Sequence, residues 1–520
     1  MDINKAISLA FEYFQTGNLQ KAEEICKEVL ELQPNNADAL HLLGLLYYQL
    51  KNYDVAIQHI RKALQISPAD PDAYYNLGNA FFEKGQIDEV ITCYQRALQL
   101  DPGFVEAYHN LGNALAEKGQ LDEAITCYQK ALQLNPNYAE AYNNLGYALY
   151  LKQGQLDEAI TCYQKALQLK PDYAEAYNNL GLAIQEKGQL DEAITCYQKA
   201  IQIDPNCIEA HWNMALALLL SGNFKQGWKK FEWRWKLEDN YQRTFSQPLW
   251  DGSNITGYTI LLHAEQGFGD TIQFIRYAPM VAQRGTKVII ECKKELTSLL
   301  HNVEGIQYVI AYGEQLPDFD VHCPLLSLPL VFNTTLESIP SKIPYITADS
   351  MLVQKWQNRV QHDNSKLKIG LAWDVGHRED KLHYRSCPLE LFSPLTQRDD
   401  ITFYSLQKGA AGEQAKNPPQ GIKLIDYTEE IHDFSDTAAF IENLDLIISV
   451  DTAVVHLAGA LGKSVWTLVP FAPDWRWMLT REDSPWYPTM RLFRQSSPGD
   501  WEPVIASIEK ELSEFISNFD

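Results

Sequence analysis

Residues 72–102 read DAYYNLGNAFFEKGQIDEVITCYQRALQLDP, and this stretch decides the fold of the first part of the chain. Leu77 and Phe81 have the spacing of one face of a helix, and Val90 and Ala97 mark a second helix in the same way. A glycine separates the two apolar runs and a proline closes the stretch, as expected where one helix stops and another unit begins. The stretch therefore predicts two helices joined by a short turn.

The same unit recurs along residues 4 to about 238. Prolines return every 34 or 35 residues, at Pro34, Pro68, Pro102, Pro136, Pro171 and Pro205. Glycines keep the same interval, at Gly44, Gly78, Gly112, Gly146 and Gly181. Small side chains at Gly78 and Ala97 predict that two helices approach closely, and Tyr94 is expected to fill the space between successive units.

This pattern resembles the tetratricopeptide repeat, whose period is 34 residues. Six clear units and a partial seventh are present, and the resemblance implies an α-solenoid over residues 1–243 with a concave surface for a partner. The seventh unit ends in an aromatic and basic segment, which is atypical, as expected for a terminal unit. We expect this segment also to dock onto the next domain. One extra residue between Gly146 and Gly154 predicts a longer turn or a small helix bulge in the fifth unit.

Charge and composition narrow the possible partners. The 520 residues, 46% hydrophobic, are typical of a globular protein of about two to four domains. The formal net charge of −23 argues against nucleic acid or an anionic membrane as a partner, because both select basic surfaces. The chain has no run of about 18 apolar residues, so no membrane span is expected.

The spacing of the cysteines matches the period of the repeat and does not indicate a set of disulfide bonds. Four of them occupy one helix position in successive units, at Cys93, Cys127, Cys162 and Cys196. The N-terminal sequence lacks a basic start and a long apolar core, so it does not read as a signal peptide. Reduced thiols and a cytoplasmic location are therefore expected.

One repeated polar position is a candidate for binding a partner. Asparagines precede the Leu-Gly pair or its equivalent in five units, at Asn76, Asn110, Asn144, Asn179 and Asn213. An amide offers a donor and an acceptor, which can pair with an extended peptide backbone of any sequence. This asparagine ladder resembles the one that grips substrate peptides in the eukaryotic protein O-GlcNAc transferase. The alternative is that the asparagines bond neighbouring helices.

The periodicity changes after residue 243. Apolar runs at 259–264, 287–292, 308–313 and 318–324 read as strands separated by helices or loops. A second series follows at 366–373, 402–407, 422–427, 444–450 and 464–470. Alternating strands and helices predict two α/β lobes with parallel sheets, residues 244–350 and 351–520, and a final helix that could cross back to the first lobe.

Candidate site residues follow the strand ends, where open α/β sheets bind ligands. In the first lobe, the stretch after the first strand contains Gln266, Gly267, Gly269 and Asp270. Its glycines allow a close backbone approach, and Asp270 suits either a helix cap or a general base.

In the second lobe, Asp451, Thr452 and Ala453 lead from a strand into a helix whose N-terminus could bind a diphosphate, with His456 one turn further. Arg385 could offset the charge of such a diphosphate. Arg378 and Lys381 read more simply as a solvated loop.

Residues 258 to about 495 resemble the heptosyltransferase-like glycosyltransferases of family 9, which have the inverting GT-B architecture. The motifs are GFGDTIQFIRYAP, RSCPLELF with FYSLQKG, and SVDTAVVHLAGALGKSVWTLVP. The resemblance implies that Asp270 activates the acceptor and that the donor is bound by Arg385, Trp373, Gln407, Asp451, Thr452, Ala453 and His456. A further stretch, 472–495, resembles a bacterial group that joins such repeats to such a transferase. That stretch contains four residues that could either line the donor site by stacking or form a core cluster: Trp475, Arg476, Trp477 and Trp486.

Three functions are compatible with the sequence. The leading hypothesis is a metal-independent inverting glycosyltransferase without a cofactor, which moves a sugar from a nucleotide-diphosphate donor to a protein or peptide held by the repeats. Residues 374–384 depart from the pattern of the resembling group, which raises the alternative of a non-catalytic repeat scaffold. The third hypothesis is a transferase for a glycan or lipid acceptor that the repeats recruit.

Overall fold

A computed structural model describes residues 2–152, 155–237, 243–376 and 385–517. It divides into two compact units, one of Met1–Lys187 with Thr195–Cys207 and one of Gly188–Ile194 with Ile208–Asp520. The expected bulge at residues 153–154 lies outside the described residues, as do Arg378 and Lys381. Among the described helices, none is both long and apolar enough to cross a membrane.

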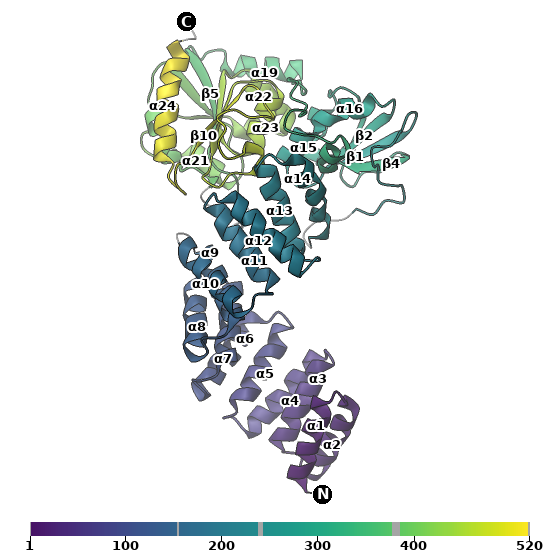
Figure 1. Ribbon diagram of the computed structural model, residues 1–520. Coiled ribbons are helices and arrows are strands. Elements are labelled where there is room, and N and C mark those ends of the chain that lie inside the picture. The colour runs from purple at the N-terminus through teal and green to yellow at the C-terminus, as the bar shows by residue number, and fades with distance from the viewer. Residues whose placement is uncertain (1, 153–154, 238–242, 377–384, 518–520) are drawn as a thin grey trace. The chain divides into compact units, whose positions relative to one another are not determined.

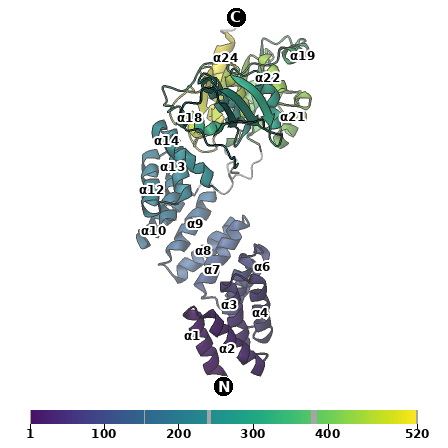
Figure 2. The same cartoon turned by 90° about the vertical axis from the view of Figure 1, so that its right-hand side faces the viewer.

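The N-terminal part is a series of antiparallel helix pairs, which can be followed in Figures 1 and 2. The helices are α1 Ile3–Gln15, α2 Leu19–Leu32, α3 Ala37–Gln49, α4 Tyr53–Ile66, α5 Pro71–Phe82, α6 Ile87–Leu100, α7 Val105–Glu117, α8 Leu121–Leu134, α9 Ala139–Leu151, α10 Leu156–Leu169, α11 Ala174–Glu186 and α12 Leu190–Ile203. The pairs begin and end where the sequence predicts, because Asn or Asp side chains cap the first helices and glycines with positive φ, such as Gly119 at 78°, end the first helix of several pairs. The predicted α-solenoid is confirmed for this part.

The repeated glycine is required by a tyrosine of the same unit. A Cβ added at Gly112 would lie 2.6 Å from Cε1 of Tyr128, and Gly78 stands in the same relation to Tyr94. Both tyrosines are almost fully buried, and the hydroxyl of Tyr128 donates to Oδ1 of Asn113 at 2.8 Å. Tyr94 thus packs between the two helices of its own unit; the sequence had suggested the space between units instead.

The C-terminal unit contains the last helix pair, α13 Ile208–Leu220 and α14 Phe224–Phe231, followed by the 3-10 helix η1 Glu232–Lys236. These helices pack on the sheets that follow. Trp228 of α14 lies edge-on to Trp475 at 5.3 Å between ring centroids, and its Nε1 donates to the carbonyl of Thr334. The seventh repeat therefore shares its core with the α/β part.

Two parallel sheets follow, as the alternation of strands and helices predicts. The first has the order β3-β2-β1-β4 and the second β10-β9-β8-β5-β6-β7. The strands are β1 Thr259–His263, β2 Lys287–Cys292, β3 Ile306–Ala311, β4 Val321–Pro324, β5 Leu367–Ala372, β6 Ile401–Ser405, β7 Ile425–Asp426, β8 Leu446–Val450, β9 Val465–Val469 and β10 Met490–Arg494. β10 lies in a stretch that was not predicted as a strand. We call the described residues of 244–350 the first lobe and those of 351–520 the second lobe.

Helices cover both faces of the second sheet (Figure 1). The helices of the first lobe are α15 Phe268–Phe274, α16 Ala278–Ala282, α17 Lys294–Leu300 and α18 Leu328–Val331. Those of the second lobe are α19 Ser350–Val360, α20 Ser393–Thr396, α21 Glu413–Lys416, α22 Phe434–Glu442, α23 Ala453–Ala460 and α24 Glu502–Ser517. The final helix α24 buries Ile508 and Leu512 against the second sheet. It belongs to the second lobe, and the crossing back to the first lobe suggested by the sequence is not observed.

We expect Gly112→Ala to destabilise the repeats by about 1–3 kcal/mol, because the added methyl group overlaps a buried ring that cannot move aside. Urea unfolding followed by far-ultraviolet circular dichroism measures the change. Gly103→Ala is the matched control, since its Cβ would meet only the Asp101 side chain, at 3.3 Å. Equal stability of the two variants would show that the glycine is not needed for packing.

Candidate functional site

Asp270 lies in the first turn of α15, which follows β1 after a turn of four residues. Its Oδ2 accepts a hydrogen bond from the backbone N–H of Gly267 at 2.7 Å, so it does cap the helix. Gln266, just before the helix, has a positive φ of 56° and is exposed. A Cβ at Gly269 would lie 2.8 Å from Cδ2 of His456, which belongs to the second lobe. The missing side chain at Gly269 therefore allows α15 to pack directly against α23.

The other oxygen of Asp270 forms an ion pair with Arg476, which lies in the 3-10 helix η8 Trp475–Trp477 of the second lobe. Nε of Arg476 donates to Oε1 of Gln273 at 2.5 Å, and its Nη1 donates to Oδ1 of Asp474 at 3.0 Å. The Asp270 side chain is 18% exposed and that of Arg476 is 9% exposed. Burial raises the pKa of the Asp270 carboxyl, while the neighbouring Arg476 acts to lower it.

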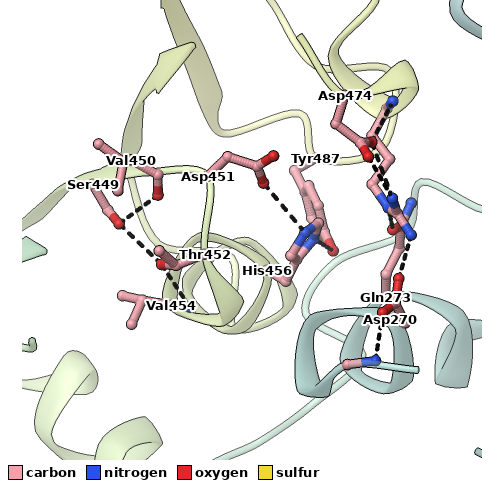
Figure 3. A network of polar contacts seen from close by, with 12 residues as sticks. Asp270, Gln273, Ser449, Val450, Asp451, Thr452, Val454, His456, Asp474 and Tyr487 are labelled. Atoms are coloured by element: carbon pink, nitrogen blue, oxygen red, sulfur yellow. Dashed lines mark hydrogen bonds and ion pairs between the residues drawn. The ribbon is translucent and has the colours of Figure 1, made fainter. Parts of the chain in front are cut away.

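On the second lobe, the strand β8 leads into α23 through Asp451 and Thr452 (Figure 3). Thr452 is the N-cap residue, and its Oγ1 accepts from the N–H of Val454 at 3.3 Å. The helix begins at Ala453, as the sequence predicts. The side chain of Asp451 is 8% exposed, and its Oδ2 accepts from Nη2 of Arg385 at 2.7 Å. These contacts bring Arg385 next to the N-terminus of α23.

His456 lies one turn into α23 and faces the first lobe. Its Nδ1 is hydrogen-bonded to the hydroxyl of Tyr487 at 2.9 Å, and its Nε2 lies 4.0 Å from Oδ1 of Asp451. The ring stacks on Trp477 at 5.5 Å between centroids. Burial, with a smaller contribution from Arg476, lowers the pKa of His456 to about 3, so the imidazole is neutral near pH 7.

Trp373 and Gln407 are engaged with their own lobe. Oε1 of Gln407 accepts from the backbone N–H groups of Trp373 and Asp374, both at 2.9 Å. Its Nε2 donates to the carbonyls of Asp374 and Lys408. The indole of Trp373 is buried and donates to Gln414 at 2.9 Å. Both residues hold the ends of β5 and β6 together, and their assignment to the donor stays a prediction.

The tryptophans of residues 472–495 belong to the core. Trp475, Trp477 and Trp486 are almost fully buried, and Trp475 contacts Phe224 and Trp228 of α14. Of the two interpretations of this stretch, the geometry favours the core cluster. The ion pair of Arg476 with Asp270 was not anticipated, because the two residues lie 206 positions apart and neither local sequence contains a signal for the other.

A second arginine joins the two lobes. Arg276, in the 3-10 helix η2 Ile275–Tyr277, is buried and donates from Nη1 to the carbonyls of Trp486 at 2.7 Å and Pro340 at 3.1 Å. Its Nη2 donates to the hydroxyl of Tyr345 at 2.9 Å. The guanidinium also lies 4.6 Å from the ring centroid of Tyr487, the partner of His456. The lobe interface beside His456 is therefore closely packed.

A third arginine connects the last repeat to β1. Arg234 of η1 is fully buried and donates through Nε and Nη2 to the two carboxylate oxygens of Glu265, both at 2.9 Å. Glu232 and Ser327 also bond this guanidinium. Because Glu265 lies two residues after the end of β1 and just before residues 266–269, the last repeat helps to fix the backbone that leads to Asp270.

The amide nitrogens of the asparagine ladder donate to the preceding repeat. Nδ2 of Asn76 lies 3.0 Å from Nε2 of His41, and Nδ2 of Asn110 donates to the hydroxyl of Tyr75 at 3.0 Å. Asn144 and Asn179 make equivalent bonds, to His109 and Asn143. These bonds agree with the alternative in which the asparagines join neighbouring helices. Asn213 lies half-buried on α13 in the C-terminal unit.

We expect Asn144→Ala to lower the stability of the repeats by about 1–2 kcal/mol, because it removes the bonds from Nδ2 to Oδ1 of Asn113 at 2.9 Å and to His109. Equilibrium urea unfolding gives the value. Asn137→Ala, at an exposed turn position, is the control and should have almost no effect. An unchanged unfolding midpoint for Asn144→Ala would mean that the ladder has no structural role.

Comparisons with known proteins identify the first part of the chain. A family model described as "TPR repeat" matches residues 44–85, 78–119, 112–153, 149–188 and 185–222. Another, "Tetratricopeptide repeat", matches residues 13–58. Residues 13–222 are tetratricopeptide repeats. The resemblance inferred from the sequence is confirmed for this part.

One curated relative matches more than the repeats. Protein FlbA of Caulobacter vibrioides is 24% identical over 343 residues, which are 58% of this chain and 54% of FlbA. The chain thus spans about half the length of this relative.

Three solved repeat structures are similar to part of the chain. MamA is 32% identical and covers 31% of this chain and 94% of its own, with a TM-score of 0.30. YrrB, described as a TPR protein with an unusual peptide-binding site, is 26% identical over 36% of this chain and 95% of its own, with a TM-score of 0.32. PilF of Pseudomonas aeruginosa is 22% identical over 40% of this chain and 94% of its own, with a TM-score of 0.37.

We expect Arg234→Gln to destabilise the C-terminal unit by about 3–5 kcal/mol, because it leaves the carboxylate of Glu265 buried without a full charge partner. Thermal and urea unfolding measure the loss. Arg359→Gln removes a similar pair with Glu430 that is about half exposed, and it should cost less than about 1 kcal/mol. Equal losses in the two variants would contradict a special role for the buried pair.

Proposed function

We propose that this protein is an inverting, metal-independent glycosyltransferase that moves a sugar from a nucleotide-diphosphate donor to a protein or peptide acceptor. One observation carries the proposal. Asp270, whose helix α15 follows β1 of the first sheet, lies where α15 packs against α23. The helix α23 follows β8 of the second sheet. The strand ends of both sheets thus contribute to one place, which is where α/β proteins bind ligands. The GT-B architecture is part of this proposal.

The chemistry assigns one task to each lobe. Asp270 would accept the proton of the acceptor hydroxyl as that oxygen forms a bond to the anomeric carbon of the sugar. The bond from that carbon to the diphosphate breaks on the opposite face, and the nucleoside diphosphate leaves with the electron pair. The N–H groups at the start of α23 and the guanidinium of Arg385 would stabilise the growing charge on the leaving group.

The repeats would supply the acceptor. The amide nitrogens of Asn76, Asn110 and Asn144 donate to the preceding repeat. Oδ1 of Asn144 already accepts from Nδ2 of Asn143 at 3.1 Å, and Oδ1 of Asn110 lies 3.2 Å from Nδ1 of His109. A carbonyl oxygen has two lone pairs, so each could accept one further N–H donor from an extended peptide. This arrangement supports a ladder that is both structural and able to bind. A glycan or lipid acceptor is the alternative, and it predicts that substitutions in the ladder leave transfer to a free acceptor unchanged.

A non-catalytic scaffold is the second candidate, and a specific observation favours it. Both oxygens of Asp270 are bonded, one by Arg476 and one by Gly267, and Asp451 is paired with Arg385. In this interpretation the paired charges leave neither Asp270 nor Asp451 available to a substrate. The repeats then supply the function by binding other proteins. Calorimetry with UDP, GDP and ADP separates the two candidates, because a scaffold of this kind binds none of them.

We expect Asp270→Asn to reduce sugar transfer by at least about 100-fold, because an amide cannot accept the proton of the acceptor hydroxyl. The assay measures release of nucleoside diphosphate from UDP-, GDP- and ADP-sugars in the presence of a peptide library, with mass spectrometry of the peptides. Asp399→Asn is the control, since Asp399 is exposed and pairs with Lys423 at the surface. Undiminished transfer by Asp270→Asn would exclude Asp270 as the base.

A further inference from the structure

Arg476 is the most heavily bonded side chain around Asp270. Its Nη1 contacts both oxygens of Asp474, at 3.0 and 3.1 Å, its Nε donates to Gln273, and its Nη2 donates to Oδ1 of Asp270. Gln273 lies on the same helix as Asp270, one turn further along. The guanidinium thus contacts two residues in one turn of α15, Asp270 and Gln273, in the first lobe. Asp474 binds the same guanidinium from the second lobe.

The neighbouring residue connects this arginine to the last repeat. The guanidinium of Arg476 lies 4.4 Å from the ring centroid of Trp475, which packs edge-on against Trp228 and Phe231 of α14. Trp475 also contacts Phe274, at the end of the helix that contains Asp270. The aromatic side chains of the last repeat therefore hold the segment from which Arg476 reaches the carboxylate.

The other charged groups around Asp270 cannot replace this contact. Asp474 and Asp451 are acidic, and both raise the pKa of Asp270 as burial does. His456 of α23 is neutral near pH 7, and Arg385 is bonded to Asp451. Among the groups that act on Asp270 in the described residues, Arg476 is therefore the cation that favours the ionised carboxylate.

We propose that Arg476 is the positioning residue of Asp270 and that α14 of the last repeat, through Trp475, keeps it in place. This inference rests on the proposed function, in which Asp270 is the general base. Gly267 fixes Oδ2 of the carboxylate and Arg476 fixes Oδ1, so the side chain cannot rotate, and each oxygen keeps a lone pair that can accept the acceptor proton. The last repeat then helps to position the candidate base, in addition to its place in the repeat array.

A pH profile of full-length variants tests the positioning. A general base must be ionised, so activity falls as the pH drops through its pKa. Without the guanidinium the pKa of Asp270 rises, and we expect Arg476→Gln to move the acidic limb of kcat/KM upward by about one pH unit or more. Arg476→Lys should restore most of this shift, because it keeps the charge. An unchanged acidic limb, or a rate above that of the unaltered protein, would overturn the proposal.

Unfolding of the same proteins supplies a test that does not depend on transfer. In a cycle of Asp270→Asn, Arg476→Gln and the double variant, we expect the double variant to unfold at about the same urea midpoint as the more severe single variant. Additive shifts would refute the contact on which the proposal depends. Arg491→Gln is the matched control, because it breaks the pair of Arg491 on β10 with Glu511 on α24 and should leave the pH profile unchanged.

The two tests separate the possible failures. If the unaltered protein transfers no sugar from any donor while the cycle is non-additive, the proposed function is wrong. The contact of Arg476 with Asp270 is then purely structural, and the positioning role is overturned as well. If transfer occurs and the Arg476→Gln profile matches the unaltered one, the proposed function stands and this inference fails. Transfer with both a shifted profile and a non-additive cycle supports it.

Discussion

Buried guanidinium groups hold the C-terminal unit together. Arg234 joins the last repeat to the residue that follows β1, Arg276 joins the first lobe to the backbone of the second, and Arg476 joins the second lobe to Asp270. Each group lies where two parts of the unit meet, and each donates several hydrogen bonds in a planar arrangement that a lysine cannot reproduce. The position of the candidate base depends on all three, because they set the end of β1, the lobe interface and the carboxylate itself.

Burying a guanidinium group has a cost in free energy, and the group then requires acceptors at fixed positions. Removing a guanidinium from water is unfavourable, and the loss is offset only where every N–H finds an acceptor. Arg276 donates to carbonyl and hydroxyl oxygens and lies against the faces of aromatic rings, whereas Arg234 and Arg476 use carboxylates. The aromatic cluster formed by α14, Trp475 and Trp486 surrounds these groups and excludes water from them. The charges at the candidate site are thus part of the packing of the unit.

The fold was largely predictable because its signals are local. The helix pairs follow from apolar spacing and from the glycine that a buried tyrosine requires, as at Gly112 and Tyr128. Nine of the ten strands follow from short apolar runs. β10 was missed because Met490–Arg494 contains two arginines, which interrupt its apolar run. The candidate site was predictable in part. Asp270 and Thr452 stand at strand ends where the sequence places them, but the pairing of Asp270 with Arg476 joins two distant segments.

The sequence by itself determined the tetratricopeptide repeats, the parallel α/β character of the second part, and the residues that begin α15 and α23. These features depend on periodicity, capping and turn residues, which act over a few positions. Only the tertiary structure decided that the last repeat shares its core with both lobes and that the asparagine amides bond the preceding repeat. It also decided that the carboxylate of Asp270 is held by a guanidinium. The reason is physical, since the partner of a buried charge is chosen by the folded geometry and not by its neighbours along the chain.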